Sequence, residues 1–144
     1  MFSGCVNLTA APILPATSGI YYYNYMSMFA DCTSLSTPPS VLPSEEIGYY
    51  SYFGMFSGCT ALTSTPIICG TTVSADCCGS MFEGCSSLIS ACTLPATTLW
   101  EQSYMDMFKG CTSLTDMPII CATTLNRESC MEMFSGCTSL TSVQ

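Results

Sequence analysis

The chain has 144 residues, of which 49% are hydrophobic and only 8% are charged, and its formal net charge is −8 at pH 7. Ten acidic residues against two basic ones, Lys109 and Arg127, disfavour binding to nucleic acid or anionic membranes, and no apolar run is long enough for membrane insertion. Histidine is absent, so the commonest general base and the usual activator of Ser or Cys nucleophiles are missing. We therefore expect a protein without a catalytic site and without a cofactor.

A single phrase, Met-Phe-x-Gly-Cys-x-x-Leu, recurs six times along the chain, with Asp31 as its only departure at the Gly position. The copies begin every 26 or 27 residues, at Met1, Met28, Met55, Met81, Met107 and Met133. A repeat this short cannot bury its own apolar face and must stack on its neighbours. We predict a single solenoid domain, cut from a longer array, with five repeats and a partial sixth: 1–27, 28–54, 55–80, 81–106, 107–132 and 133–144.

Within each repeat we expect a short extended segment followed by a short helix. Adjacent apolar pairs such as Ile67 and Ile68, preceded by a proline, indicate a strand in which one residue of the pair points inward. Residues 98–101 resemble a capping box, and Leu99, Ser103 and Met107 would fall on one helical face. The glycine of the repeated phrase lies where a left-handed C-terminal cap would end the helix, and Asp tolerates that conformation at position 31.

One short parallel strand plus one short helix per 26–27-residue repeat predicts an α/β repeat solenoid, a right-handed coil of the leucine-rich-repeat type. The phrases Met-Phe-Lys-Gly-Cys-Thr-Ser-Leu-Thr at 107–115 and Thr-Leu-Pro-Ala-Thr-Thr-Leu at 93–99 resemble the BspA-like leucine-rich-repeat family of surface and secreted proteins. The resemblance covers essentially the whole chain. It implies a cell-surface or secreted protein involved in adhesion, and no shared catalytic site, because that family is defined by its scaffold.

Four cysteines vary in pairs. Twelve positions before the next repeat's Met, repeats two to five carry Pro43, Cys69, Pro95 and Cys121; three positions before it, they carry Tyr52, Cys78, Tyr104 and Cys130. Because Cys occurs at both places or at neither, we predict disulfide bonds Cys69–Cys78 and Cys121–Cys130, each worth about 2–3 kcal/mol in the chain-entropy model. A third bridge would join Cys77 and Cys92. The alternative is that the paired cysteines are small buried hydrophobes in a reducing compartment.

The cysteines of the repeated phrase form a different group. They recur in every copy, and their parallel side chains in a stack disfavour disulfide geometry, so we expect a row of free, buried thiols: Cys5, Cys32, Cys59, Cys85, Cys111 and Cys137. The chain has no Cys-x-x-Cys pair and no calcium-loop pattern among its carboxylates, so we expect no metal site.

Two surfaces are candidates for binding. The outward positions of the expected strand offer small, hydroxyl and apolar groups that suit a protein, a glycan or another copy of the chain, although they would equally serve to cover the sheet: Ile13, Thr65, Ile67, Thr93, Met117 and Ile119. The second candidate is the tyrosine cluster at the end of the first two repeats: Tyr21, Tyr22, Tyr23, Tyr25, Tyr49, Tyr50 and Tyr52. In addition, Asn7-Leu-Thr9 matches an N-glycosylation acceptor.

The sequence therefore predicts an extracellular, non-enzymatic scaffold for adhesion to, or recognition of, protein or glycan surfaces. The alternative is a structural subunit that binds other copies of itself end to end in an extracellular fibre, because neither end of the chain shows a polar capping repeat. A thiol redox enzyme is a third and weaker hypothesis, which would require a reactive thiol at Cys77, Cys78 or Cys92.

Overall fold

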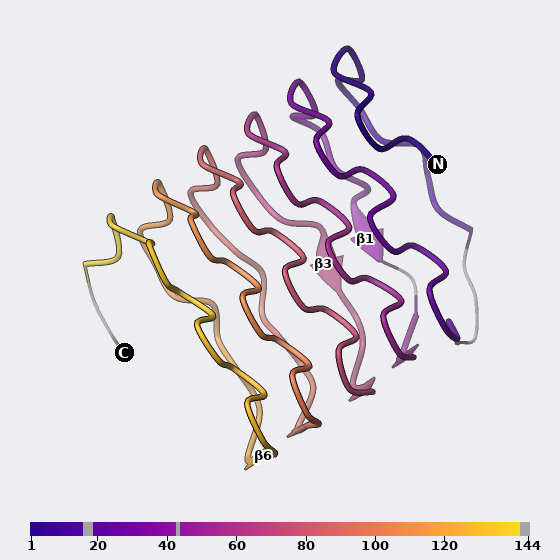
Figure 1. The fold of residues 1–144 in the computed structure, drawn as a ribbon, viewed down its shortest axis with the longest axis vertical. Coiled ribbons are helices and arrows are strands. Elements are labelled where there is room, and N and C mark those ends of the chain that lie inside the picture. Colours follow the sequence, from indigo (N-terminus) through magenta and orange to yellow (C-terminus); the bar gives the residue numbers. More distant parts are fainter. Residues whose placement is uncertain (16–18, 43, 142–144) are drawn as a thin grey trace.

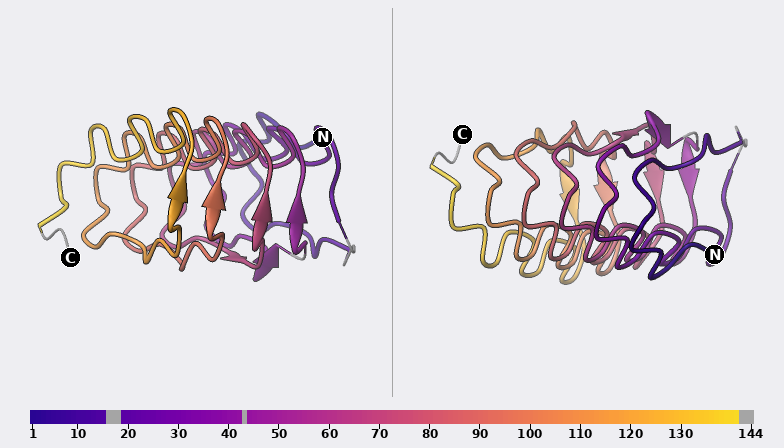
Figure 2. Two further views of the ribbon diagram at one scale, coloured as in Figure 1. Left: turned by 90° about the horizontal axis from the view of Figure 1, so that it is seen from below. Right: turned by 90° about the horizontal axis from the view of Figure 1, so that it is seen from above.

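The computed structural model describes residues 1–15, 19–42 and 44–141, so Pro43 and the last three residues of the partial sixth repeat lie outside the described residues. Each repeat forms one turn of the chain, and successive turns lie side by side from the N-terminal to the C-terminal end (Figure 1). Both views in Figure 2 show the same order, with the first and the last turn at opposite ends. We refer to each turn as a layer, numbered 1 to 6 by repeat.

The described residues form six strands of two residues each: β1 (Val41–Leu42), β2 (Glu46–Ile47), β3 (Ile67–Ile68), β4 (Thr72–Val73), β5 (Thr98–Leu99) and β6 (Thr124–Leu125). They pair in parallel between neighbouring layers, β1 with β3, β2 with β4 and β5 with β6, which gives three two-stranded sheets. In β3, Ile67 points outward and Ile68 is buried, as expected for an adjacent apolar pair in a strand. Single parallel bridges join further layers, among them Ile20 with Ile47 and Leu94 with Ile120.

The segment that leads from the strands into the repeated phrase is a series of turns. Alternate amides bond in two directions: the N–H groups of Tyr25 and Ser27 donate to the carbonyls of Ser51 and Phe53 in the next layer, whereas the N–H of Met28 donates to the carbonyl of Tyr25, three residues back. A residue with positive φ occurs at every fourth position, where a type II turn requires one. The backbone polar groups are thus satisfied partly within a layer and partly by the neighbouring layer.

The helix predicted in each repeat is therefore wrong, because the part of the chain that the structure describes contains no helix, and accordingly none that would cross a membrane. The error has a physical cause. Buried side chains in this segment recur every four residues, as at Ser103, Met107 and Cys111, and over two turns a period of four differs little from the 3.6 of a helix. The predicted leucine-rich-repeat solenoid is therefore wrong as well, because the strands are two residues long and belong to separate two-stranded sheets.

The core consists of rows of identical side chains that run from layer to layer. The phenylalanines of the repeated phrase stack with ring centroids 5.5 to 5.7 Å apart. Those of layers 2 to 5 are fully buried, as are the leucines of the same phrase: Phe29, Phe56, Phe82, Phe108, Leu35, Leu62, Leu88 and Leu114. Each layer therefore buries its apolar face only against its neighbours, which is the packing that a short repeat requires.

Candidate binding site

All twelve cysteines, each within the described part of the chain, are free. The predicted disulfide bonds Cys69–Cys78 and Cys121–Cys130, and the third bridge between Cys77 and Cys92, are therefore corrected. The prediction assumed that a strand leads directly into a helix, and without the helix the paired positions lie in different environments. Cys121 is exposed while Cys130 packs against the core. The sulfur of Cys78 is buried, 3.4 Å from that of Cys77.

The paired variation of Cys and Tyr agrees better with packing. Tyr52, Cys78 and Tyr104 occupy the same position in layers 2 to 4 and are all buried. Burial raises the pKa of the Tyr104 phenol, and the neighbouring thiols of Cys78 and Cys77 raise it further. A layer with a small thiol thus lies between two layers with large phenol rings, which requires no covalent bond.

The thiols of the repeated phrase are donors between layers. The sulfur of Cys59 donates to the carbonyl of Phe29 at 3.1 Å, and the same bond recurs along the row from Cys32 to Cys137. Burial raises the pKa of Cys59 and of Cys111 to about 12, so both thiols stay protonated and weakly nucleophilic at neutral pH. In the end layers the row is open: Cys5 is exposed and Cys137 is half-buried.

The outward positions of the predicted strand lie in two environments. Ile13, Ile67 and Ile119 are 96%, 56% and 67% exposed. Thr93 is also exposed, whereas Thr65 and Met117 are half-buried. The pairing of β1 with β3 places Val41 beside Ile67, and the bridge between Leu94 and Ile120 places Thr93 beside Ile119. We refer to these exposed side chains, one from each of layers 1 to 5, as the isoleucine row: Ile13, Val41, Ile67, Thr93 and Ile119.

The isoleucine row adjoins a shallow hollow near its C-terminal end. Met117, Pro118, Ile119 and Ile120 line a volume of about 340 Å³ there. The predicted glycosylation residue Asn7 is exposed in layer 1. Among the described residues, no three Cys, Asp or Glu side chains gather as a metal ion would require.

The tyrosine cluster is divided between the core and the surface. Tyr52 is fully buried, and Tyr25 packs on it with ring centroids 5.8 Å apart. Tyr22 stacks on Tyr49 at 5.8 Å, with the two planes 7° apart, and both rings are exposed. Tyr21 and Tyr23 are also exposed, and Tyr23 stacks on the half-buried Tyr50. The outer tyrosines thus form short stacks that continue the layer spacing on the surface.

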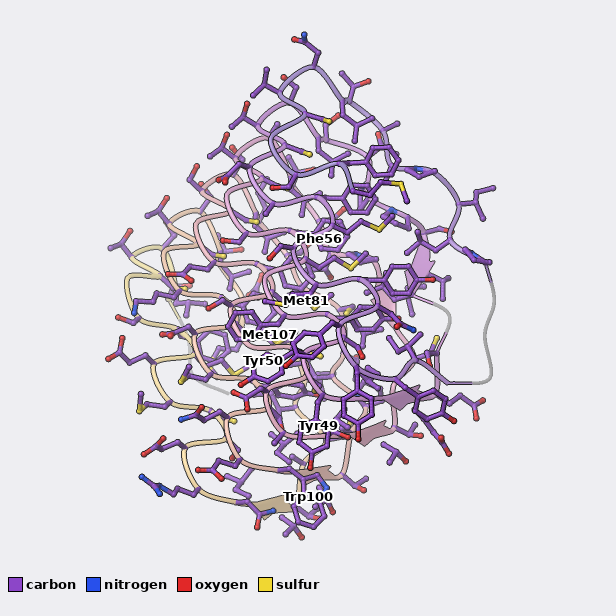
Figure 3. All side chains as sticks on the ribbon, turned by 45° about the vertical axis from the view of Figure 1, so that its right-hand side comes forward. Tyr49, Tyr50, Phe56, Met81, Trp100 and Met107 are labelled. Atoms are coloured by element: carbon purple, nitrogen blue, oxygen red, sulfur yellow. The ribbon has the colours of Figure 1, made fainter. Side chains whose placement is uncertain are left out.

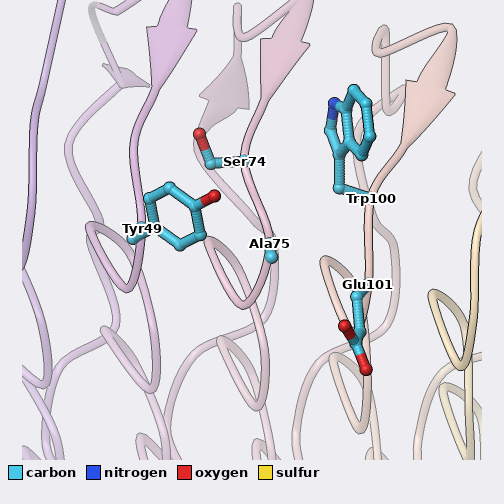
Figure 4. A pocket seen from close by; sticks show the side chains of 5 residues that line it. All are labelled: Tyr49, Ser74, Ala75, Trp100 and Glu101. Carbon is cyan, nitrogen blue, oxygen red and sulfur yellow. The ribbon is translucent and has the colours of Figure 1, made fainter.

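The Tyr22–Tyr49 stack ends at a hollow of about 300 Å³, lined by Tyr49, Ser74, Ala75, Trp100 and Glu101 (Figure 4). The small residues Ser74 and Ala75 of layer 3 lie between Tyr49 of layer 2 and the Trp100–Glu101 pair of layer 4. Figure 3 places Tyr49 and Trp100 toward the same end of the layers. We refer to this site as the Tyr–Trp hollow.

One carboxylate lines the Tyr–Trp hollow, and another lines the adjoining hollow. Glu101 lies in it, and the exposed guanidinium of Arg127 is 3.9 Å from the Glu101 carboxylate. A second hollow shares Ser74 and is lined in part by Tyr21 and Glu46. The Asp76 carboxylate raises the pKa of the nearby Tyr50 phenol. The surface here is therefore both aromatic and acidic.

Sequence reasoning identified the tyrosines but missed Trp100 and the hollow beside it. The signal was present in the repeat alignment: the position that holds Tyr22 and Tyr49 in layers 1 and 2 holds Ala75 in layer 3. A ring missing from a stacked row leaves a gap that is visible once the rows are known to be in register.

No family model matches the chain, and no curated protein or solved structure matches it. The resemblance to the BspA-like family, which depends on short phrases at 93–99 and 107–115, therefore stays a prediction. The function of the chain has to be inferred from its surface.

Proposed function

We propose that this chain is an extracellular, non-enzymatic scaffold that adheres to or recognises a protein or glycan surface. The observation that supports this function best is the isoleucine row, in which Ile13, Ile67 and Ile119 stand more than half exposed. Val41 and Ile67 lie side by side in this row, and adjoining exposed apolar side chains are typical of interaction sites. Because the row repeats at the spacing of the layers, it presents an extended surface, as repeat proteins commonly do.

Cys77, one of the three thiols that a redox site could use, supports a structural interpretation over a redox one. Burial, together with the neighbouring thiol of Cys78, raises the pKa of Cys77 well above its ordinary value, so little reactive thiolate forms there. A redox enzyme needs an accessible thiolate, and Cys77 offers neither the exposure nor the ionisation.

The extracellular location is supported by composition and by the BspA-like resemblance. Only 8% of the residues are charged, which is unusual for a soluble domain of a cell's interior. Because the disulfide bonds predicted from the sequence are absent, they no longer contribute to this argument.

An adhesion assay with a matched charge control tests the proposed function. Beads coated with the protein are scored for attachment to immobilised extracellular-matrix proteins and to a glycan array. We expect the double substitution Ile67→Asp and Ile119→Asp to abolish any attachment seen with the parent chain. Thr71→Asp with Thr123→Asp changes exposed residues of the same two layers by the same charge, and should leave attachment intact. Equal loss in both variants would argue against the isoleucine row as the binding surface.

A second candidate function is the structural subunit of an extracellular fibre. The observation in its favour is that the layers are joined by the same pattern of backbone hydrogen bonds throughout, a pattern that copies of the chain can share across an end-to-end contact. Electron microscopy of the native protein separates the candidates: filaments support the fibre, and isolated short particles support the recognition scaffold.

A further inference from the structure

We propose that the Tyr–Trp hollow binds the guanidinium group of an arginine side chain from a basic protein partner. In layer 3 the hollow follows β4, whereas Ile67 comes before that strand. The hollow shares no residue with the isoleucine row, so this inference goes beyond the adhesion surface and does not depend on it.

Layer 3 leaves a ring position vacant next to the Tyr22–Tyr49 stack. Tyr22 and Tyr49 stack face to face at 5.8 Å, and Tyr23 and Tyr50 do so at 5.3 Å. The next position after Tyr49 in its row is Ala75, which has no ring. A planar group placed over Ala75 therefore meets the open face of Tyr49 at the spacing that the chain already uses for its own rings. This spacing is within the roughly 6 Å over which a cation is attracted to an aromatic face.

Residues of layer 4 line the far side of the hollow. Trp100 and Glu101 project from layer 4, so a group over Ala75 has an indole and a carboxylate beyond it (Figure 4). A volume of about 300 Å³ is at the lower limit of small-ligand sites. The hollow thus suits one side chain rather than an extended oligosaccharide.

The charge of the surface around the hollow favours a cation. The chain has ten acidic and two basic residues, and Glu46 lines the adjoining hollow that shares Ser74. Glu101 is only loosely paired, because Arg127 lies 3.9 Å away and both side chains are more than half exposed. An acidic, aromatic surface attracts cations and repels anions. Among cationic side chains, the guanidinium is planar, stacks on aromatic rings and pairs with a carboxylate through two parallel hydrogen bonds.

The single tryptophan makes the binding directly measurable, because Trp100 is the only Trp in the chain and lies in the hollow. The probe is N-acetyl-arginine amide, which presents an arginine as a chain residue does. We expect saturable quenching of Trp100 fluorescence that weakens as salt is raised. The citrulline analogue, which keeps the planar shape without the charge, should bind about tenfold more weakly or not at all, which corresponds to one lost charge interaction.

Two substitutions locate the probe within the hollow. Ala75→Tyr fills the vacant position, continues the Tyr22–Tyr49 stack and should abolish quenching with no loss of thermal stability. Glu101→Gln should weaken binding about tenfold, whereas Glu83→Gln, the same change at a carboxylate that does not line the hollow, should have no effect.

Three results would overturn the proposal. Equal binding of the arginine and citrulline probes would show that charge does not select the ligand. Quenching by methyl glucoside alone would assign the hollow to glycans. Unchanged binding by both Ala75→Tyr and Glu101→Gln would place the arginine elsewhere on the surface.

Discussion

The thiol of Cys85 donates a hydrogen bond to the carbonyl oxygen of Phe56, 3.1 Å away in the preceding layer. That carbonyl also accepts the N–H of Cys59 within its own layer, so a single oxygen joins two layers. Because Phe56 stacks on Phe82, which belongs to the same layer as Cys85, the thiol row and the phenylalanine row stabilise the same contact. The repeated phrase thus supplies both the apolar and the polar part of the interface between layers.

Removal of one ring from the phenylalanine row should be strongly destabilising. Phe82 is fully buried, with Phe56 and Phe108 stacked on its two faces at 5.5 Å. We expect Phe82→Ala to lower the free energy of unfolding by about 3–5 kcal/mol, measured by urea denaturation, because it leaves a cavity between two layers. Phe134 is half-buried in layer 6, so Phe134→Ala should cost less. Equal costs would contradict the expectation that burial between two layers sets the cost.

The fourth position of the repeated phrase tests backbone strain. Asp31 has φ of 58° where the other repeats have glycine, for instance Gly84 with φ of 73°. We expect Asp31→Gly to raise the free energy of unfolding by about 1 kcal/mol and Gly84→Ala to lower it by a similar amount, because a side chain disfavours the left-handed conformation. A Cβ at Gly84 would approach Gly58 no closer than 3.9 Å, so a steric clash does not contribute. Thermal unfolding of both variants measures the pair, and a loss of stability in Asp31→Gly would contradict the strain argument.

These positions also show how far the sequence predicts the fold. The left-handed conformation expected at Gly58 and Asp31 is found, since each needs only local information. The helix is not found, because what replaces it is not local: the N–H of Tyr25 donates to the carbonyl of Ser51, 26 residues further along the chain. Local propensity and hydrophobic period describe the chain's own segment and do not detect a backbone partner in the next layer.

The candidate sites were predictable to a similar degree. The exposure of Ile67 and the burial of Ile68 follow from the alternation within a strand. The Tyr–Trp hollow depends on which side chains of three layers become neighbours, and Trp100 has no equivalent Trp in another repeat to draw attention to it. The disulfide prediction failed because covariation reports proximity or packing and does not by itself identify a bond.

Alkaline pH should destabilise the protein through its buried thiols. Burial raises the pKa of Cys59 and of Cys111 from the ordinary value of 9.0 to about 12. Between pH 9 and 12 the unfolded chain loses these protons while the folded chain keeps them, so stability is fully present below pH 9 and falls as the pH rises. We expect a decline of about 1.4 kcal/mol per pH unit for each such thiol. Urea denaturation between pH 8 and 11, with a reductant present, measures it.

A matched variant isolates the contribution of one thiol to this pH dependence. Cys111→Ala removes one buried titrating group and should make the decline with pH shallower by the share of that thiol. Thr112→Ala, which changes an exposed neighbour that does not titrate, should leave the slope unchanged. A parent protein whose stability is constant from pH 9 to 11 would contradict the assignment of raised pKa values.

Mass analysis after alkylation tests the free state and the burial of the cysteines together. In the native protein we expect the exposed Cys5 and Cys121 to react with iodoacetamide first, and the fully buried Cys59, Cys77 and Cys85 to be protected.

In denaturant without a reductant, all twelve cysteines should react, because none is bonded in the structure. If four cysteines of the denatured protein reacted only after a reductant was added, and these were the pairs that covary with Tyr and Pro, the packing explanation would fail. Labelling of Cys77 in the native protein as fast as Cys121 would likewise show that the core opens readily between layers 3 and 4.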